Sequence, residues 1–247
     1  RMPRTRPSRR EQPSQSVLMI GSEALPFSKT GGLADVLGAL PSALARLGWH
    51  VTLVVPKYRG VTAGRFVERM PLTIGGYHAD VSFYEEPLAD GARAILVDEP
   101  ALFDRAYLYG EGSLDYPDNP RRFALLVRAA FEWALRASFS PDIIHGHDWQ
   151  AGLAPVYQRV LYAGNPAFAR ARSVFTIHNL AYQGRFEPDW VPRLDLPWSV
   201  YTVEQLEFWG SMSFLKGGVT GADAVTTVSP EYAREIQTPE GGAGFDG

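Results

Sequence analysis

The chain has 247 residues, 45% of them hydrophobic, so it can bury an ordinary core as one large domain or two small ones. Its formal net charge of -3 gives no basic field for nucleic acid, and the absence of cysteine excludes disulfides and thiolate metal sites. Because no apolar run approaches the length of a membrane span, we expect a cytoplasmic protein with no nucleic acid or membrane partner.

Residues 1–16 differ in composition from the rest of the chain. They hold five arginines against one acidic residue, Glu11, and contain no apolar segment. Such a segment has too little hydrophobicity to form a core. We therefore expect a disordered basic tail at 1–16, followed by a folded domain at 17–247.

Residues 17–47 predict a strand, a loop and a helix. The run at 17–20 is unbroken apolar, as in a strand covered on both faces. One face of the helix would consist of residues spaced mainly by three or four, namely Leu33, Val36, Leu37, Leu40, Leu44 and Leu47. Pro41 is expected to kink or divide this helix. Between strand and helix, Lys29, Thr30, Gly31 and Gly32 come where unpaired backbone N–H groups favour an anion.

The next elements indicate an α/β fold. A second apolar strand at 51–55 completes a strand, helix, strand unit, which implies a right-handed parallel crossover. We therefore predict a doubly wound, mostly parallel, Rossmann-like sheet. Segments 73–78, 81–85 and 93–97 read as short strands of a meander at one edge, and 98–118 as a loop with one helical turn.

The second half continues the alternation of helices and strands. A helix is predicted from Asn119, with Pro120 in its first turn. After it we predict a strand at 142–145, a helix at 151–162, a strand at 173–177, and a strand at 224–228 that leads into a helix capped by Ser229.

Four polar motifs follow four of these strands. They are SEALPFSKTGGLAD, HGHDWQAG, HNLAYQG and SPEY. Open parallel sheets bind ligands in the crevice beyond the carboxyl ends of their strands. We therefore expect the four motifs to share one edge of the molecule and to form one site.

The motifs KTGGLADV, HGHDW, TIHNLAYQG and TTVSPEYAREI closely resemble stretches of bacterial glycogen synthases and plant starch synthases, over residues 17 nearly to the end. The resemblance implies the N-terminal half of a GT-B architecture. It implies a retaining α-1,4-glucosyltransferase that moves glucose from ADP-glucose to the non-reducing end of an α-1,4-glucan. It also implies a C-terminal nucleotide-binding domain that this chain lacks, so we expect the chain to be inactive alone.

The resemblance also implies roles for matching residues. His178 and Asp148 would be catalytic, and the substrate-binding residues would be Lys29, Thr30, Gly31, Gly32, Asp35, Asn179, Tyr182 and Gln183. A lysine offsets the charge of a diphosphate, carboxylates accept hydrogen bonds from sugar hydroxyls, and a histidine can donate or accept.

Plainer roles are open for several of these residues. Lys29 alone could be a solvated loop lysine, Asp35 could complement the helix dipole, and Asp148 could be a helix cap. His145 is expected to be a structural histidine with a hydrogen-bond partner. We assign no metal and no cofactor, because His145 and His147 lack further ligands at a recognised spacing.

Two alternative functions fit the same sequence. The first is a non-catalytic glucan-binding or interaction module that reuses the fold. The second is a transferase that uses another sugar nucleotide, such as UDP-glucose. The resemblance implies retention of configuration, with donor and acceptor held on the same face of the sugar. The sequence offers no obvious nucleophile for a double displacement.

Overall fold

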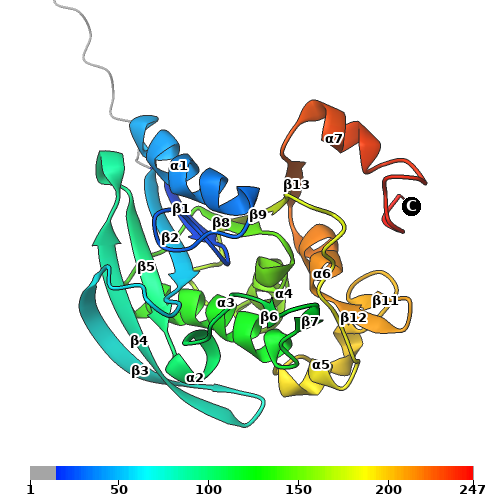
Figure 1. Cartoon of the computed structure of the whole chain (residues 1–247), viewed down its shortest axis with the longest axis horizontal. Coiled ribbons are helices and arrows are strands. Elements are labelled where there is room, and N and C mark those ends of the chain that lie inside the picture. Colours follow the sequence, from blue (N-terminus) through cyan, green and yellow to red (C-terminus); the bar gives the residue numbers. More distant parts are fainter. Residues whose placement is uncertain (1–14, 247) are drawn as a thin grey trace, which may run out of the picture.

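An eight-stranded sheet forms the centre of the computed structural model, which describes residues 15–246 (Figure 1). The strands lie in the order β13-β9-β8-β1-β2-β5-β4-β3. They are β1 (Ser16–Ile20), β2 (His50–Pro56), β3 (Arg65–Ile74), β4 (Tyr77–Pro87), β5 (Arg93–Asp98), β8 (Ile143–His147), β9 (Arg172–Ile177) and β13 (Ala224–Thr227). All strands from β13 to β5 pair in parallel, whereas β4 and β3 pair antiparallel. The predicted doubly wound, mostly parallel sheet is confirmed.

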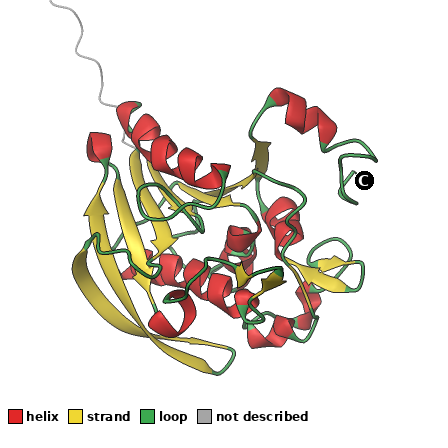
Figure 2. Ribbon diagram, viewed as in Figure 1, coloured by secondary structure: helices red, strands yellow, loops and turns green. Residues whose placement is uncertain are grey.

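Helices cover both faces of this sheet (Figure 2). They are α1 (Gly32–Arg46), α2 (Pro100–Phe103), α3 (Asn119–Arg136), α4 (Ala154–Val160), α5 (Trp190–Arg193), α6 (Phe214–Gly221) and α7 (Pro230–Glu235), with short 3-10 turns η1 (Ala89–Gly91), η2 (Trp149–Ala151) and η3 (Trp198–Val200). A small three-stranded sheet consists of β10 (Arg185–Phe186), β12 (Ser211–Ser213) and β11 (Glu207–Phe208). A two-stranded sheet consists of β6 (Gly110–Glu111) and β7 (Leu114–Asp115). Within residues 15–246, none of the helices is both long and apolar enough to cross a bilayer.

Strand β1 is buried on both faces, and its residues divide between two hydrophobic cores. Val17 and Met19 belong to the core that contains Leu37 of α1. Leu18 and Ile20 belong to the core that contains the apolar face of α3. Successive side chains of a strand point to opposite faces, so a strand covered on both sides must be apolar throughout. This explains the unbroken apolar run at the start of the domain.

The direction in which successive strands are added to the sheet changes at β1. From β1 the chain goes to β2 and β5 on one side, while β8, β9 and β13 lie on the other side. The crevice that such a reversal leaves beyond the carboxyl ends of β1 and β8 is the usual ligand site of this fold. The loops after β1, β8 and β9 carry three of the four polar motifs.

The predicted strand at 73–78 is wrong, because a hairpin turn interrupts it. Gly75 and Gly76 both have positive φ, of 51° and 82°, and connect β3 to β4 as a two-residue turn. Paired glycines adopt such values readily. Both strands are therefore longer than expected. The antiparallel meander at the edge is confirmed, and its third strand, β5, also pairs in parallel with β2.

Other boundaries differ less from expectation. Helix α1 runs through Pro41 and is not divided there, and the predicted helix at 151–162 is shorter and follows the turn η2. The single helical turn expected within 98–118 is α2. The predicted tail lies outside the described residues except at its end, where Ser16 already belongs to β1 and donates its backbone N–H to Asp142 Oδ2 at 2.8 Å.

Gly152 offers a test of the packing that supports the second motif. A Cβ at this position would overlap the carbonyl oxygen of Phe214 at the start of α6. We expect Gly152→Ala to lower the free energy of unfolding by about 1–3 kcal/mol, because a backbone carbonyl cannot rotate away as a side chain can. Urea unfolding of the chain measures this loss. The control is Gly164→Ala, whose Cβ would meet nothing within 4 Å. Equal unfolding midpoints for the two variants would contradict the packing described.

Candidate functional site

A cavity of about 1000 Å³ opens beyond the carboxyl ends of β1, β8 and β9. Three of the polar motifs line it. They contribute Glu23 and Thr30, Gly31, Gly32 and Leu33 from the first, Asp148, Trp149 and Gln150 from the second, and His178, Asn179, Ala181, Tyr182, Gln183 and Gly184 from the third. The SPEY motif lines no part of it, although Val228 directly before it does. Instead, Tyr232 supports the third loop from outside, because its hydroxyl accepts a hydrogen bond from the backbone of Leu180 at 3.0 Å.

Most of the residues predicted for the site meet in this cavity. Those brought together are Thr30, Gly31, Gly32, Asp148, His178, Asn179, Tyr182 and Gln183. Lys29 and Asp35, also predicted to bind substrate, are not among the lining residues. The Lys29 ammonium lies 2.7 and 2.8 Å from the two carboxylate oxygens of Asp35, and both side chains are about half exposed. Their opposite charges attract each other at the rim of the site.

Asp148 connects two of the loops. Its Oδ1 accepts a hydrogen bond from the backbone N–H of His178 at 2.7 Å and a longer one from Asn179 at 3.4 Å. Its backbone has φ 56° and ψ 178°, a conformation that residues other than glycine rarely adopt. Burial raises the pKa of its carboxyl to about 6, against the lowering effect of these two hydrogen bonds. Asp148 is thus a strained, desolvated acid at the centre of the site.

Three histidines near Asp148, namely His145, His147 and His178, have adjacent rings. His147 Nδ1 is 3.0 Å from His178 Nε2, and His145 Nε2 is 2.7 Å from the hydroxyl of Thr176. His145 therefore has the partner expected of a structural histidine. Burial lowers the pKa of His145 and of His178 to about 4, and holds that of His147 well below its ordinary value. All three imidazoles are neutral at pH 7, so they act as hydrogen-bonding groups and not as charges.

Glu23 is a site residue for which no role was predicted. Its carboxylate is almost fully buried, lines the cavity, and accepts hydrogen bonds from the backbone N–H of Thr30 at 2.6 Å and from its hydroxyl at 2.8 Å. Burial raises its pKa. It therefore satisfies a backbone donor beside the start of α1, where a ligand anion was expected. The only sequence signal was an acidic residue inside the first motif.

Several other lining residues were also missed, among them Tyr109, Asp115, Gln150 and Arg185. The hydroxyl of Tyr109 is 2.8 Å from that of Ser22. Gln150 is 6% exposed, and its Oε1 is buried with no hydrogen-bond partner among residues 15–246. Gln150 belongs to the HGHDWQAG motif, but no role was predicted for it. Tyr109 and Asp115 come from the 98–118 loop, and nothing local in the sequence relates them to a site made by distant strands.

The polar groups of the cavity suit a ligand rich in hydroxyl groups. Glu23 and Asp148 contribute carboxylate acceptors, and the neutral ring of His178 contributes a donor or an acceptor. No group of three His, Cys, Asp or Glu side chains within residues 15–246 is arranged to hold a metal ion.

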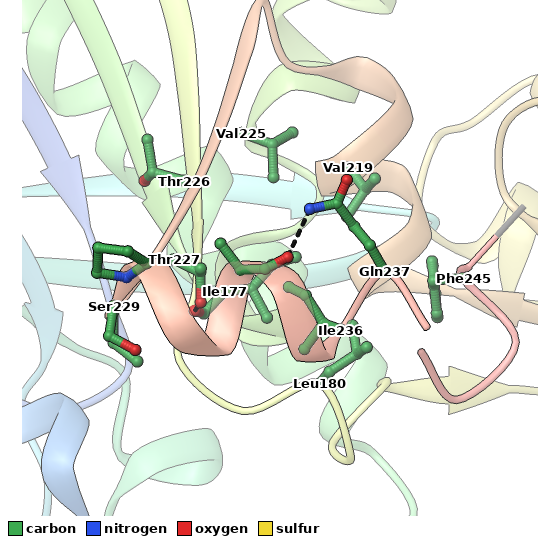
Figure 3. Close-up of a pocket in the computed structure, with 13 residues that line it drawn as sticks. Ile177, Leu180, Val219, Val225, Thr226, Thr227, Ser229, Ile236, Gln237 and Phe245 are labelled. Atoms are coloured by element: carbon green, nitrogen blue, oxygen red, sulfur yellow. Dashed lines mark hydrogen bonds between the residues drawn. The ribbon is translucent and has the colours of Figure 1, made fainter. Parts of the chain in front are cut away.

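A second cavity, of about 600 Å³, lies between β13, α6, α7 and the stretch around Phe245 (Figure 3). Its lining is mostly apolar, with Ile177, Val219 and Ile236 among the residues that surround it. None of its described lining residues is charged or is a histidine. It therefore lacks the groups that bind or activate a polar substrate, and the larger cavity is the candidate site.

Comparison with known proteins identifies the family. The sequence-family model described as the starch synthase catalytic domain matches residues 16–247. The glycogen synthase of Koribacter versatilis (strain Ellin345) is 47% identical over 234 residues, which cover 94% of this chain and 48% of that protein. The glycogen synthase of Myxococcus xanthus (strain DK1622) is 47% identical over 241 residues, covering 94% and 50%.

A solved structure agrees with these relatives. The catalytic domain of starch synthase IV from Arabidopsis thaliana, bound to ADP and acarbose, matches with a TM-score of 0.80 at 31% identity, over 94% of this chain and 48% of that one. The chain spans about half the length of the curated relatives it matches. By its sequence and its fold, the chain belongs to the starch synthase catalytic domain family, and its relatives include bacterial glycogen synthases and a plant starch synthase.

Proposed function

We propose that this chain is the N-terminal, acceptor-side half of a glycogen or starch synthase. The complete enzyme would move glucose from ADP-glucose to the non-reducing end of an α-1,4-glucan with retention of configuration. The observation that carries this proposal is the convergence of three family motifs on one polar cavity of about 1000 Å³. The bound ADP and acarbose of the Arabidopsis relative support an adenine nucleotide and a sugar chain as ligands.

The chemistry of the cavity fits the recognition of sugar. Carboxylate and amide oxygens accept hydrogen bonds from hydroxyl groups, and they do so strongly where water is excluded. The carboxylates of Glu23 and Asp148 would be the main acceptors. Among the lining residues that the structure describes, Arg185 is the one side chain with a permanent positive charge. Most of the charge that offsets a diphosphate would therefore come from the rim and from the other half of the enzyme.

The chain alone should bind ADP-glucose weakly and should transfer no glucose. A transfer site needs donor and acceptor held together, and the donor is expected on the half of the relatives that this chain does not cover. Calorimetry with ADP-glucose and an assay with maltotetraose measure binding and transfer. We expect transfer to return when the uncovered half of a matched relative, such as the glycogen synthase of Koribacter versatilis, is supplied as a separate chain.

The same assay separates the alternatives. Binding of maltotetraose without restored transfer would favour a glucan-binding module, and robust transfer by the isolated chain would contradict the half-enzyme assignment. Competition between ADP-glucose and UDP-glucose in the restored enzyme would identify the donor.

Lys29 should affect the use of the donor without affecting the fold. Its ammonium is half exposed and paired only with Asp35, so it can turn toward a phosphate when the two halves close on a substrate. In the restored enzyme, Lys29→Ala should lower kcat/KM for the donor by roughly ten- to a hundredfold, the worth of one charged hydrogen bond. The matched control is Arg59→Ala, which removes the exposed ion pair with Asp104. Equal kinetics for the two variants would refute the role of Lys29.

Asp148 should lower the stability of the chain at neutral pH. Its pKa is raised from 3.8 to about 6, so between these values the folded chain binds more protons than the unfolded chain, and stability falls as pH rises. The penalty at pH 7 is about 3 kcal/mol. Asp148→Asn keeps an oxygen that can accept from His178 and removes the charge. It should raise the free energy of unfolding at pH 7 by up to that amount, and by only roughly 1 kcal/mol at pH 4.5.

Urea unfolding at the two pH values measures this difference, and the restored enzyme should lose activity in the same variant. Asp104→Asn is the control, because its carboxylate is 55% exposed and should show no comparable gain. A variant at Asp148 that is less stable than the parent at both pH values would contradict the desolvation described.

A further inference from the structure

His147 occupies an unusual position, because it is fully buried and yet only one of its ring nitrogens has a partner. It is the last residue of β8, and its exposed fraction is 0%. Nδ1 lies 3.0 Å from Nε2 of His178, whereas Nε2 is buried and has no hydrogen-bond partner among residues 15–246. The proposed function assigns no role to this residue.

The contact between the two rings restricts where their protons lie. A hydrogen bond between two ring nitrogens needs one proton, so one imidazole donates and the other accepts. A charged ring would allow other arrangements, but both rings are desolvated and neutral at pH 7. Two arrangements of neutral tautomers remain.

The unpartnered nitrogen of His147 discriminates between them. If His178 donated, Nδ1 of His147 would be the acceptor, and the proton of His147 would lie on the buried Nε2 with nothing to receive it. If His147 donates from Nδ1, its Nε2 carries only a lone pair. Buried N–H groups without an acceptor are rarer in proteins than buried acceptors without a donor. The second arrangement is therefore favoured.

The surroundings hold the His147 ring in this orientation. The ring of His145 lies against it with centroids 4.0 Å apart, and His145 is itself held by the hydroxyl of Thr176. Thr176 in turn contacts the hydroxyl of Thr226 on β13 at 2.7 Å. Hydrogen bonds from β13 and β9 thus hold His145, whose ring packs against His147, and His147 in turn contacts His178 at the cavity.

We propose that His147 is a positioning residue that keeps the proton of His178 on Nδ1, so that His178 presents a hydrogen-bond donor to a sugar oxygen. The sugar as ligand rests on the proposed function, whereas the tautomer does not. With its Nε2 accepting from His147, and with no bond to Nδ1 among residues 15–246, His178 offers the cavity an N–H and no free lone pair. His178 would then orient the sugar and would not act as a general base.

Long-range ¹H–¹⁵N NMR correlation of the isolated chain at pH 7 tests this assignment without any ligand. We expect both His147 and His178 to carry their proton on Nδ1. His147→Asn, whose amide nitrogen can replace Nδ1 as a donor, should preserve the Nδ1 tautomer of His178. His147→Leu removes the donor and should shift the His178 signal toward the form protonated on Nε2.

A proton on Nε2 of His178 in the parent chain would overturn the assignment, and so would an unchanged Nδ1 tautomer in His147→Leu. If the leucine variant does not fold, the parent and the asparagine variant still decide the question. Addition of maltotetraose to the same sample should shift the His178 Nδ1–H resonance. If His178 carries its proton on Nδ1 but its resonance does not shift with maltotetraose, the proposed sugar ligand is contradicted. The role of His147 would still stand.

Discussion

The hydrogen bond from the backbone of His178 to the carboxylate of Asp148 joins the loops that follow β8 and β9, and the shape of the cavity depends on it. The fold alone brings only the ends of the two strands together. The link has a cost, because Asp148 has a backbone conformation worth about 1–3 kcal/mol of strain and a carboxylate removed from water. Proteins keep such features where surrounding packing holds them and function uses them.

The electrostatics of the cavity follow from the same burial. Desolvation raises the pKa of Glu23 and Asp148 and lowers that of His178, so the ring of His178 is neutral at pH 7. Buried acceptors of this kind suit hydroxyl groups, whereas Lys29 lies at the rim of the cavity, paired with Asp35.

Much of the fold could be predicted because it depends on local patterns. The apolar run of β1 reports burial on both faces, and the helical spacing of α3 reports its apolar side. The position of each motif directly after a strand placed Asp148 and His178 in one site, because parallel strands end at one edge. The prediction of a strand at 73–78 was wrong because paired glycines can either lie within a strand or form a hairpin turn. The pairing of β3 with β4 decides between the two.

The sequence by itself indicated most strands of the main sheet, the helices α1 and α3, the family, and the loops from which most of the site is built, because these depend on neighbours along the chain. It did not indicate α5, α6 or the small sheet of β10, β11 and β12. Only the tertiary structure decided which side chains in those loops meet. It paired Lys29 with Asp35 outside the cavity, and it joined Glu23 to Thr30 and His147 to His178 within the site. It also brought in Tyr109 from a distant loop. Distances, burial and pKa shifts arise between residues far apart in the chain, and no local pattern encodes them.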